Sequence, residues 1–237
     1  MAFSRRRFLH AASCTGTWLA LNPGRTGEVL AADSNSLQWQ DLGEGLAVIA
    51  GAGGSVLVVD GKDGVAMVDG GNARSSAALL TLVKSHTGKQ PGLLFNSHCH
   101  RDQIGCNQTL GKQGATIIAH ENTRLWLTTE IISKWEHQVY PPLPAAAWPN
   151  KTFYYDSETL EFNHTLNYGY LPQAHTDGDI YVQLPQLNLI CVGDVVSASG
   201  YPLADYATNG WIGGMITTLS QLLGLCDDNT RVVTSSG

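Results

Sequence analysis

The sequence predicts an α/β (α+β) fold, a four-layer αββα sandwich. Short apolar runs typical of strands are followed by a helix-like segment, and this order occurs twice along the 237 residues. Two such halves can bury their apolar faces by stacking two sheets between outer helices. The chain is long enough for one large domain or two small ones, and its 26 glycines suit many tight turns.

The first half contains five predicted strands and three predicted helices. The strands are short apolar runs bounded by turns, at residues 46–50, 55–60, 65–69, 92–95 and 115–119. The clearest helix covers residues 72–85, because leucines and a valine between 79 and 83 form one apolar face. Gly88 and Pro91 end it. A short helix is predicted at 103–110 and a longer one, in two pieces, at 121–135.

The second half begins with a loop at residues 139–149, which contains four prolines and no regular period. A connection of this length can reach over a functional site. Strand patterns then return, followed by one helix and a last strand. The predicted strands are residues 152–155, 160–162, 167–171, 180–184, 189–192 and 231–234, and the helix is residues 215–225.

Residues 1–31 are predicted to be a twin-arginine signal peptide, and residues 32–237 to be the folded domain. Ser4-Arg5-Arg6-Arg7-Phe8-Leu9 matches the export pattern, an apolar stretch follows, and small residues near Ala31 suit cleavage. The apolar stretch is too short and too polar for a stable membrane anchor. The pattern therefore favours export to the periplasm, and the alternative is a basic tail.

The formal net charge of −6 argues against nucleic acid or an anionic membrane surface as a partner, since both require a basic face. We expect a small-molecule substrate, and the oligomeric state is left open. The five cysteines fit neither a paired zinc pattern nor a dense disulfide scaffold. Cys191 lies in an apolar run, so it is expected in the core.

A segment directly after the fourth predicted strand carries the strongest chemical pattern. His98, His100 and Asp102 alternate along the chain, and alternate residues of an extended chain point to one side. Imidazole and carboxylate are ligands that zinc accepts. Cys99 points away from the histidines in such a chain, so it is not expected to bind metal. Taken alone, the pattern has an equally good structural explanation, two polar residues at a strand exit.

Two later segments each contain one more metal-capable side chain. His175 lies at the end of a strand before a glycine turn, and Asp194 ends an apolar run. Alone, such an aspartate is more often a turn former or a helix cap. Such a histidine is more often a surface residue.

Together and in this order, these segments resemble the metallo-β-lactamase superfamily. Its motifs are HxHxDH, GHTxGD, a strand-ending GD pair, a final GHG and an early strand-ending Asp-Gly. The corresponding segments here are His98-Cys99-His100-Arg101-Asp102-Gln103, Ala174-His175-Thr176-Asp177-Gly178-Asp179, Gly193-Asp194, Ser235-Ser236-Gly237 and Asp69-Gly70-Gly71. The resemblance spans nearly the whole domain and implies the αββα fold.

The resemblance also implies a zinc hydrolase site on loops at one edge of the sandwich. His98, His100 and His175 would hold the first zinc and leave one position open for water. Zinc lowers the pKa of that water, and the metal-bound hydroxide would attack a carbonyl carbon. Asp102 would be both a metal ligand and the catalytic carboxylate that orients the water or takes a proton. Asp194 would bridge two metals, or support a single one.

The sequence departs from the family pattern at two ligands of the second metal. Gln103 and Ser236 stand where the family has histidines, and an amide and a hydroxyl are poor zinc ligands. We therefore expect one firmly bound zinc and a second site that is weak or empty. Family members commonly continue past the last motif into a covering helix, so we expect either a fragment or an open sheet edge.

Candidates for lining a substrate pocket are Gln103, Trp148, Tyr201, Trp211 and Ser236. For the tryptophans the alternative is packing in the core or anchoring a loop. Tyr201 and Trp211 follow Asp194, where the family places a loop near its site.

These features predict an exported zinc-dependent hydrolase that acts on an ester, thioester, lactone or β-lactam. The alternative is a metal-binding accessory protein of the same fold with weak or no turnover, which the two missing histidines favour. An iron-carrying electron-transfer member is less favoured, since such members usually need carboxylate-rich second sites. Fold and metal site recur across many chemistries, so they do not name the substrate.

Overall fold

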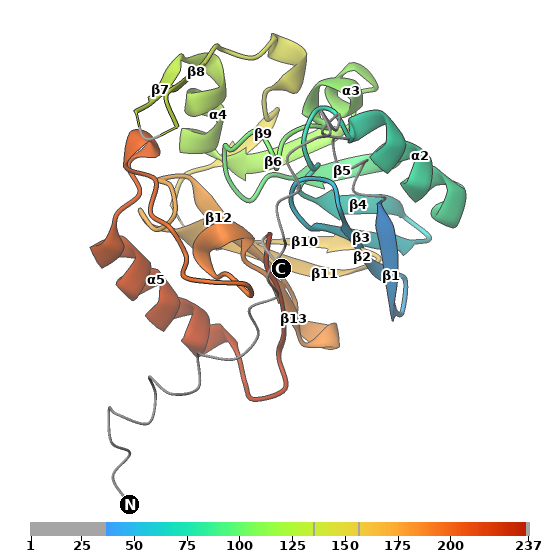
Figure 1. Cartoon of the computed structure of the whole chain (residues 1–237). Helices are drawn as coiled ribbons and strands as arrows, with labels where there is room; N and C mark the ends of the chain where they lie inside the picture. Colours follow the sequence, from blue (N-terminus) through green and yellow to red (C-terminus); the bar gives the residue numbers. More distant parts are fainter. Residues whose placement is uncertain (1–36, 135, 156, 236–237) are drawn as a thin grey trace, which may run out of the picture. The chain divides into compact units, whose positions relative to one another are not determined.

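Two β-sheets stacked face to face form the centre of the domain (Figure 1). The computed structural model describes residues 37–134, 136–155 and 157–235, all within one compact unit that spans Asn35–Gly237. The first sheet has seven strands in the order β1-β2-β3-β4-β5-β6-β9. Their bounds are β1 Gln38–Gly43, β2 Leu46–Ala50, β3 Val56–Gly61, β4 Gly64–Val68, β5 Pro91–Phe95, β6 Thr116–His120 and β9 Lys151–Phe153. Neighbours from β1 to β4 are antiparallel, whereas β4, β5, β6 and β9 run parallel.

The second sheet has five strands in the order β10-β11-β12-β13-β14. Their bounds are β10 Ser157–Phe162, β11 His164–Leu171, β12 Asp179–Leu184, β13 Leu189–Cys191 and β14 Arg231–Val233. All neighbours are antiparallel except β13 and β14, which are parallel. A separate hairpin pairs β7 (Ile131–Ser133) with β8 (Gln138–Tyr140).

The alternation of apolar side chains along the strands builds two interior layers from the first sheet. On β3, Leu57 and Val59 face the core between the sheets, whereas Val56 and Val58 face the outer helices. Successive residues of a strand point to opposite faces, so a strand that is covered on both faces must be apolar throughout. The continuous apolar run of β3 is therefore explained by its place in a four-layer fold.

Helices cover the outer faces of both sheets (Figure 1). On the first sheet, α2 (Ser76–Thr87) packs through Leu79 and α3 (Asn107–Lys112) through Leu110. On the second sheet, α5 (Ile212–Leu225) packs through Met215 and Leu222. A shorter helix, α4 (Glu121–Thr128), follows β6, and the His120 side chain caps it by accepting from Asn122 N. The layer order αββα is thereby confirmed.

Several segments differ from the predicted elements. The helix predicted at 103–110 is observed as α3, which begins at Asn107, and the helix predicted at 215–225 begins at Ile212. Residues 139–140 of the predicted loop belong to β8. Strand β1 was not predicted, because its residues are largely exposed and show no apolar alternation. Residues 131–133, predicted as helix, form β7, since α4 ends earlier and the β-branched Ile131 pairs with β8. The helix predicted from residue 72 begins at Ser76, because Asn72 forms a turn in which its side chain accepts from Ser75 N.

Some predictions fall on parts of the chain that the structure does not describe. The predicted signal peptide (1–31), its boundary at residue 32 and Ser236 all lie outside the described residues. Within the described ranges, no helix combines the length and the apolar character that crossing a bilayer requires.

Candidate metal centre

Three imidazole rings from two separate loops converge at one end of the sheets. His98 and His100 follow β5, and His175 lies between β11 and β12. One ligand atom from each ring lies within 4.8 Å of the others. The ring centroids are 4.7 to 4.8 Å apart, and the planes are nearly perpendicular to one another. The structure therefore brings together the three histidines that the sequence singled out.

The nitrogen of each ring that faces away from the centre has a hydrogen-bond partner. His175 Nδ1 donates to the Leu203 carbonyl at 2.7 Å, and His100 Nε2 donates to Asp205 Oδ2 at 2.9 Å. His98 Nδ1 lies 2.9 Å from the hydroxyl of Ser97. A carbonyl or carboxylate oxygen can only accept a hydrogen bond, so His175 carries its proton on Nδ1 and His100 carries its proton on Nε2. The lone pair of each of these two rings therefore lies on the other nitrogen, His175 Nε2 and His100 Nδ1.

The nitrogens that face the centre fit a borderline divalent cation. His98 Nε2 is fully buried and has no hydrogen-bond partner among the described residues. Burial, followed by the neighbouring His175 and His100, lowers the pKa of His98 well below its ordinary value, so the ring is neutral with an available lone pair. His100 Nδ1 and His175 Nε2 are only 3.0 Å apart. Burial also lowers the pKa of His175, whereas the hydrogen bond and charge of Asp205 raise that of His100 against the effect of burial. Three imidazole nitrogens around one point match the protein ligands of a catalytic zinc, which leaves a fourth position open.

Asp205 is a site residue that the sequence analysis missed. It belongs to the loop after β13, and it accepts hydrogen bonds from Thr208 Oγ1 at 2.8 Å and Ala207 N at 2.9 Å in addition to His100. Burial alone would raise the pKa of Asp205, but the hydrogen bonds from His100, Thr208 and Ala207 lower it to about 2. The carboxylate is therefore ionised and holds the His100 ring by its Nε2–H. The only sequence signal was an aspartate suited to cap a short turn.

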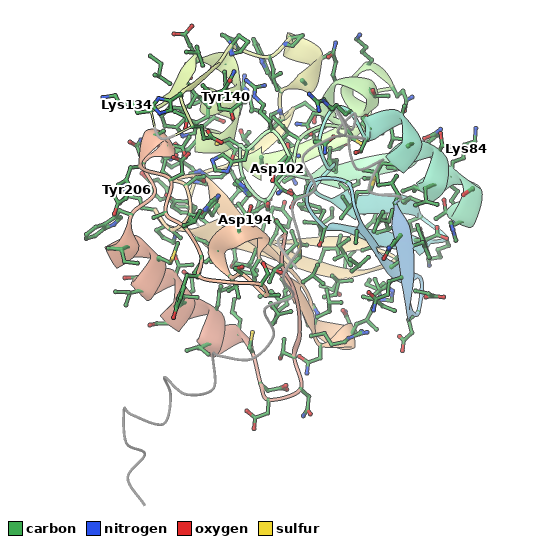
Figure 2. The ribbon with its side chains drawn as sticks, viewed as in Figure 1. Lys84, Asp102, Lys134, Tyr140, Asp194 and Tyr206 are labelled. Atoms are coloured by element: carbon green, nitrogen blue, oxygen red, sulfur yellow. The ribbon has the colours of Figure 1, made fainter. Side chains whose placement is uncertain are left out.

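Asp194 lies at the rim of the three-histidine centre. It is part of a short 3₁₀ turn, Gly193–Val195, and its Oδ2 is 3.4 Å from His98 Nε2 and 4.0 Å from His175 Nε2. Gly193 has φ +58°, and a Cβ there would lie 2.8 Å from Ser97 Oγ, so glycine is required where the two loops meet. Figure 2 shows Asp102 on the first-sheet side and Asp194 on the second-sheet side of this region.

Asp102 is held by its neighbour Gln103. Gln103 Nε2 donates to Asp102 Oδ2 at 3.1 Å, and the Gln103 side chain is fully buried. A Cβ on Gly54 would lie 2.6 Å from the Gln103 amide, so Gly54 makes room for it. Gln103 Oε1 and Ser235 Oγ are buried without hydrogen-bond partners among the described residues. A neutral amide, which contacts the Asp102 carboxylate, thus stands where the family pattern has a histidine ligand of a second metal.

The remaining predicted pocket residues within the described ranges differ in burial. Trp148 is partly buried, donates to the Leu143 carbonyl and packs against the cluster around Cys99, which anchors the proline-rich loop. Tyr201 is 96% exposed and Trp211 is 51% exposed. Their contact with substrate stays a prediction. Cys99 is buried away from the imidazoles, in agreement with its predicted role, and Cys191 packs in the core between the sheets.

Asp69 supports the loop that carries His98. Its backbone has φ +67°, a left-handed conformation that aspartate tolerates better than most residues. Its Oδ1 accepts from Ser97 N at 2.8 Å, while Oδ2 is buried without a hydrogen-bond partner among the described residues. Burial raises the pKa of Asp69 to about 8, despite the hydrogen bond from Ser97. In the metal-free protein the group is therefore a neutral acid at pH 7.

Asp69→Asn is expected to remove a pH dependence of stability. A folded-state pKa of about 8 lies above the ordinary value of 3.8, so the wild type loses stability as the pH rises from about 4 to about 8. Relative to the variant, the free energy of unfolding of the wild type falls by at most about 1.4 kcal/mol per pH unit. Above pH 8 the difference between the two free energies no longer changes with pH. Urea unfolding of both chelator-treated proteins between pH 5 and pH 9 measures this. A difference that does not change with pH would contradict the assignment.

Comparison with known proteins places this architecture in a family. Residues 50–230, more than half of the chain, match the model of the metallo-beta-lactamase superfamily. No curated protein matches. Three solved structures that the chain resembles are a metallo-beta-lactamase from Pontibacter korlensis, FIM-1 from Pseudomonas aeruginosa in a mono-zinc form and a metallo-beta-lactamase from Erythrobacter litoralis.

The three likenesses are similar in extent. The Pontibacter korlensis protein has a TM-score of 0.68 at 18% identity over 85% of this chain and 92% of that chain. FIM-1 has a TM-score of 0.63 at 16% identity over 86% of this chain and 89% of that chain. The Erythrobacter litoralis protein has a TM-score of 0.66 at 17% identity over 86% of this chain and 91% of that chain. Identities this low establish the fold alone. The family match over residues 50–230, together with the three converging imidazoles, shows that the chain belongs to the metallo-beta-lactamase superfamily.

Proposed function

We propose that this metallo-hydrolase binds one zinc ion and hydrolyses a carbonyl substrate, an ester, thioester, lactone or β-lactam. The observation that carries the proposal is the convergence of His98 Nε2, His100 Nδ1 and His175 Nε2, each backed through the other ring nitrogen. A zinc ion held there would act as a Lewis acid and lower the pKa of a water molecule to about 7.

The side chains of the protein have separate tasks in this proposal. The three imidazoles hold the cation, and Asp205 and the Leu203 carbonyl fix two of the rings in the tautomer that binds. Gln103 holds Asp102 through Oδ2, and the Asp102 carboxylate would take a proton from the attacking water. Asp194, near two of the imidazoles, would orient that water.

The function is tested with a panel of chromogenic substrates. Zinc-loaded protein is assayed with 4-nitrophenyl esters, a chromogenic thioester and nitrocefin, in parallel with protein stripped by a chelator and with stripped protein given zinc again. Hydrolysis that is lost on stripping and restored by zinc supports a hydrolase. Equal background rates in all three samples across the panel would instead favour an accessory protein that keeps the fold without turnover.

The protein is expected to bind one zinc equivalent tightly per chain. Asp102 and Asp194 are the family's second-site carboxylates, but Gln103 supplies an amide that already contacts Asp102. Of the compared structures, FIM-1 was solved in a mono-zinc form. Titration of the stripped protein with zinc against a competing chelator measures the stoichiometry. Two equivalents of comparable affinity would contradict a single firm site.

We also propose export by the twin-arginine route, which rests on Ser4-Arg5-Arg6-Arg7-Phe8-Leu9 and the apolar stretch behind it. Replacing Arg5 and Arg6 with lysine is expected to keep the full chain in the cytoplasm of a bacterial host, while the unchanged chain reaches the periplasm. Fractionation and immunoblotting measure the distribution. Unchanged periplasmic accumulation of the lysine variant would contradict this route.

A further inference from the structure

The loops that meet at the metal centre carry an excess of negative charge. Three loops supply its residues: 96–106, 172–179 and 193–211. Their charged residues are Asp102, Asp177, Asp179, Asp194, Asp205 and Arg101. One arginine against five aspartates gives a formal charge of 1 − 5 = −4, with histidines neutral. A bound Zn²⁺ would bring this to −4 + 2 = −2, so the metal does not reverse the sign.

Arg101, the single cationic side chain of these loops, already contacts another part of the protein. Arg101 is partly buried, and its Nη2 donates to the Pro141 carbonyl of the proline-rich loop. Its guanidinium carbon lies 5.7 Å from the centre of the Tyr140 ring, a cation–π arrangement. Arg101 therefore fastens one loop to another, and an anionic substrate would have to compete with these contacts.

The second half of the chain offers no replacement for Arg101. Residues 152–230 contain no lysine and no arginine, and this stretch includes the whole loop that follows Asp194. The exposed side chains of this loop are uncharged, and they include Tyr201, 96% exposed, and Leu203, 65% exposed. Leu203 is adjacent to the centre, since its carbonyl accepts from His175 Nδ1. Groups of this kind contact a neutral, partly apolar ligand without desolvating a charge.

We propose that the substrate is a neutral ester or lactone with no anionic group near the scissile carbonyl. This inference rests on the proposed hydrolase function and narrows its substrate class. A carboxylate beside the scissile bond would approach three loops of net negative formal charge, with no free cation in them to pair with it. Bicyclic β-lactams, which carry a carboxylate next to the amide, and thioesters of anionic carriers are therefore disfavoured.

The first test uses two esters with acyl chains of equal length. 4-Nitrophenyl butyrate is neutral, and 4-nitrophenyl hemisuccinate ends in a carboxylate. With the zinc-loaded protein at an ionic strength of about 0.01 M, kcat/KM for the hemisuccinate is expected to be lower by at least about tenfold. The gap narrows at about 0.15 M, because salt screens the repulsion. Equal or faster hydrolysis of the hemisuccinate overturns the proposal. If the wild type prefers the hemisuccinate and Arg101→Ala loses this preference, Arg101 is the group that binds the substrate carboxylate.

A charge placed on the loop after Asp194 gives the second test. Tyr201→Lys puts a cation two residues from Leu203 at a position where the side chain is almost fully exposed, so the fold tolerates it. This variant is expected to raise the ratio of kcat/KM for the hemisuccinate to kcat/KM for the butyrate several-fold. Leu223→Lys is the matched control, because Leu223 is 76% exposed and lies eleven residues, roughly 16 Å, along α5 from Ile212. If both variants change this ratio equally, the effect does not come from a charge near the metal centre, and the proposal is contradicted.

A binding measurement separates failure of this inference from failure of the proposed function. If chelation leaves the hydrolysis of both esters unchanged, the hydrolase proposal fails. Cobalt-substituted protein is then titrated with 2-mercaptoethanol and with mercaptoacetate, and the sulfur-to-cobalt charge-transfer absorption is followed. Tighter binding of mercaptoethanol, by about tenfold at low salt, supports the charge selectivity without any turnover. Equal or tighter binding of mercaptoacetate overturns it.

Discussion

His98→Ala is expected to abolish tight metal binding and to lower kcat/KM by at least about 10³-fold, because only the metal supplies an ionised water near pH 7. His98 is the most deeply buried of the three imidazoles, and its Nε2 has no hydrogen-bond partner among the described residues. Two imidazoles alone leave the cation without the third nitrogen donor of a catalytic zinc site. Elemental analysis of the purified protein and hydrolysis of a chromogenic ester measure the two effects.

The control for this prediction is another histidine that does not reach the centre. His86, near the end of α2, stacks on Trp39 with ring centroids 4.2 Å apart, on the outer side of the first sheet. His86→Ala is expected to keep one zinc equivalent and full activity. Urea unfolding of the chelator-treated proteins checks that His98→Ala folds. A folded His98→Ala protein that keeps zinc and turnover would show that the metal lies elsewhere.

The parts of the fold that the sequence predicted are those in which local pattern and tertiary role coincide. The apolar runs of β3 and β5 are buried on both faces, and the apolar stripe of α2 faces the first sheet. In these elements the residues that must be buried are the apolar residues of the sequence pattern. Strand β1 lacks such a pattern because it is exposed and is specified by pairing with β2. The short β7 could not be separated from a helix, since its few apolar residues fit either period.

The site was predictable to the extent that its residues lie on one strand exit. His98 and His100 follow from the alternation after β5, whereas His175 was linked to them only through the family resemblance, because it is 75 residues further along the chain. Asp205 was missed for the same reason, and no motif surrounds it. Its role arises from the path of the loop after β13, whose backbone also supplies the Leu203 carbonyl to His175.

Asp205→Asn is expected to weaken zinc binding by about 10- to 100-fold. The ionised carboxylate of Asp205 can only accept, so it fixes the proton of His100 on Nε2 and leaves the Nδ1 lone pair for the metal. An asparagine amide can present either its oxygen or its NH₂ group, and it no longer stabilises the partial positive charge of a metal-bound imidazole. Competition with a chelator of known affinity measures the change in Kd, and kcat per bound zinc is measured in parallel.

The pH dependence distinguishes this positioning role from a merely structural one. The pKa of Asp205 is lowered to about 2, so its contribution is complete above the ordinary value of 3.8 and is lost only as the pH falls towards 2. Burial lowers the pKa of His100, but the hydrogen bond and charge of Asp205 raise it above its ordinary value, so protons compete with zinc for this ring in the wild type. The ratio of wild-type to variant zinc affinity is therefore expected to fall as the pH is lowered from 8 to 6. Asp228→Asn, in the exposed turn before β14, is the matched control and should bind zinc like the wild type. If Asp205→Asn binds zinc as tightly as this control, the carboxylate does not position His100, and the backbone of the loop alone must hold the ring.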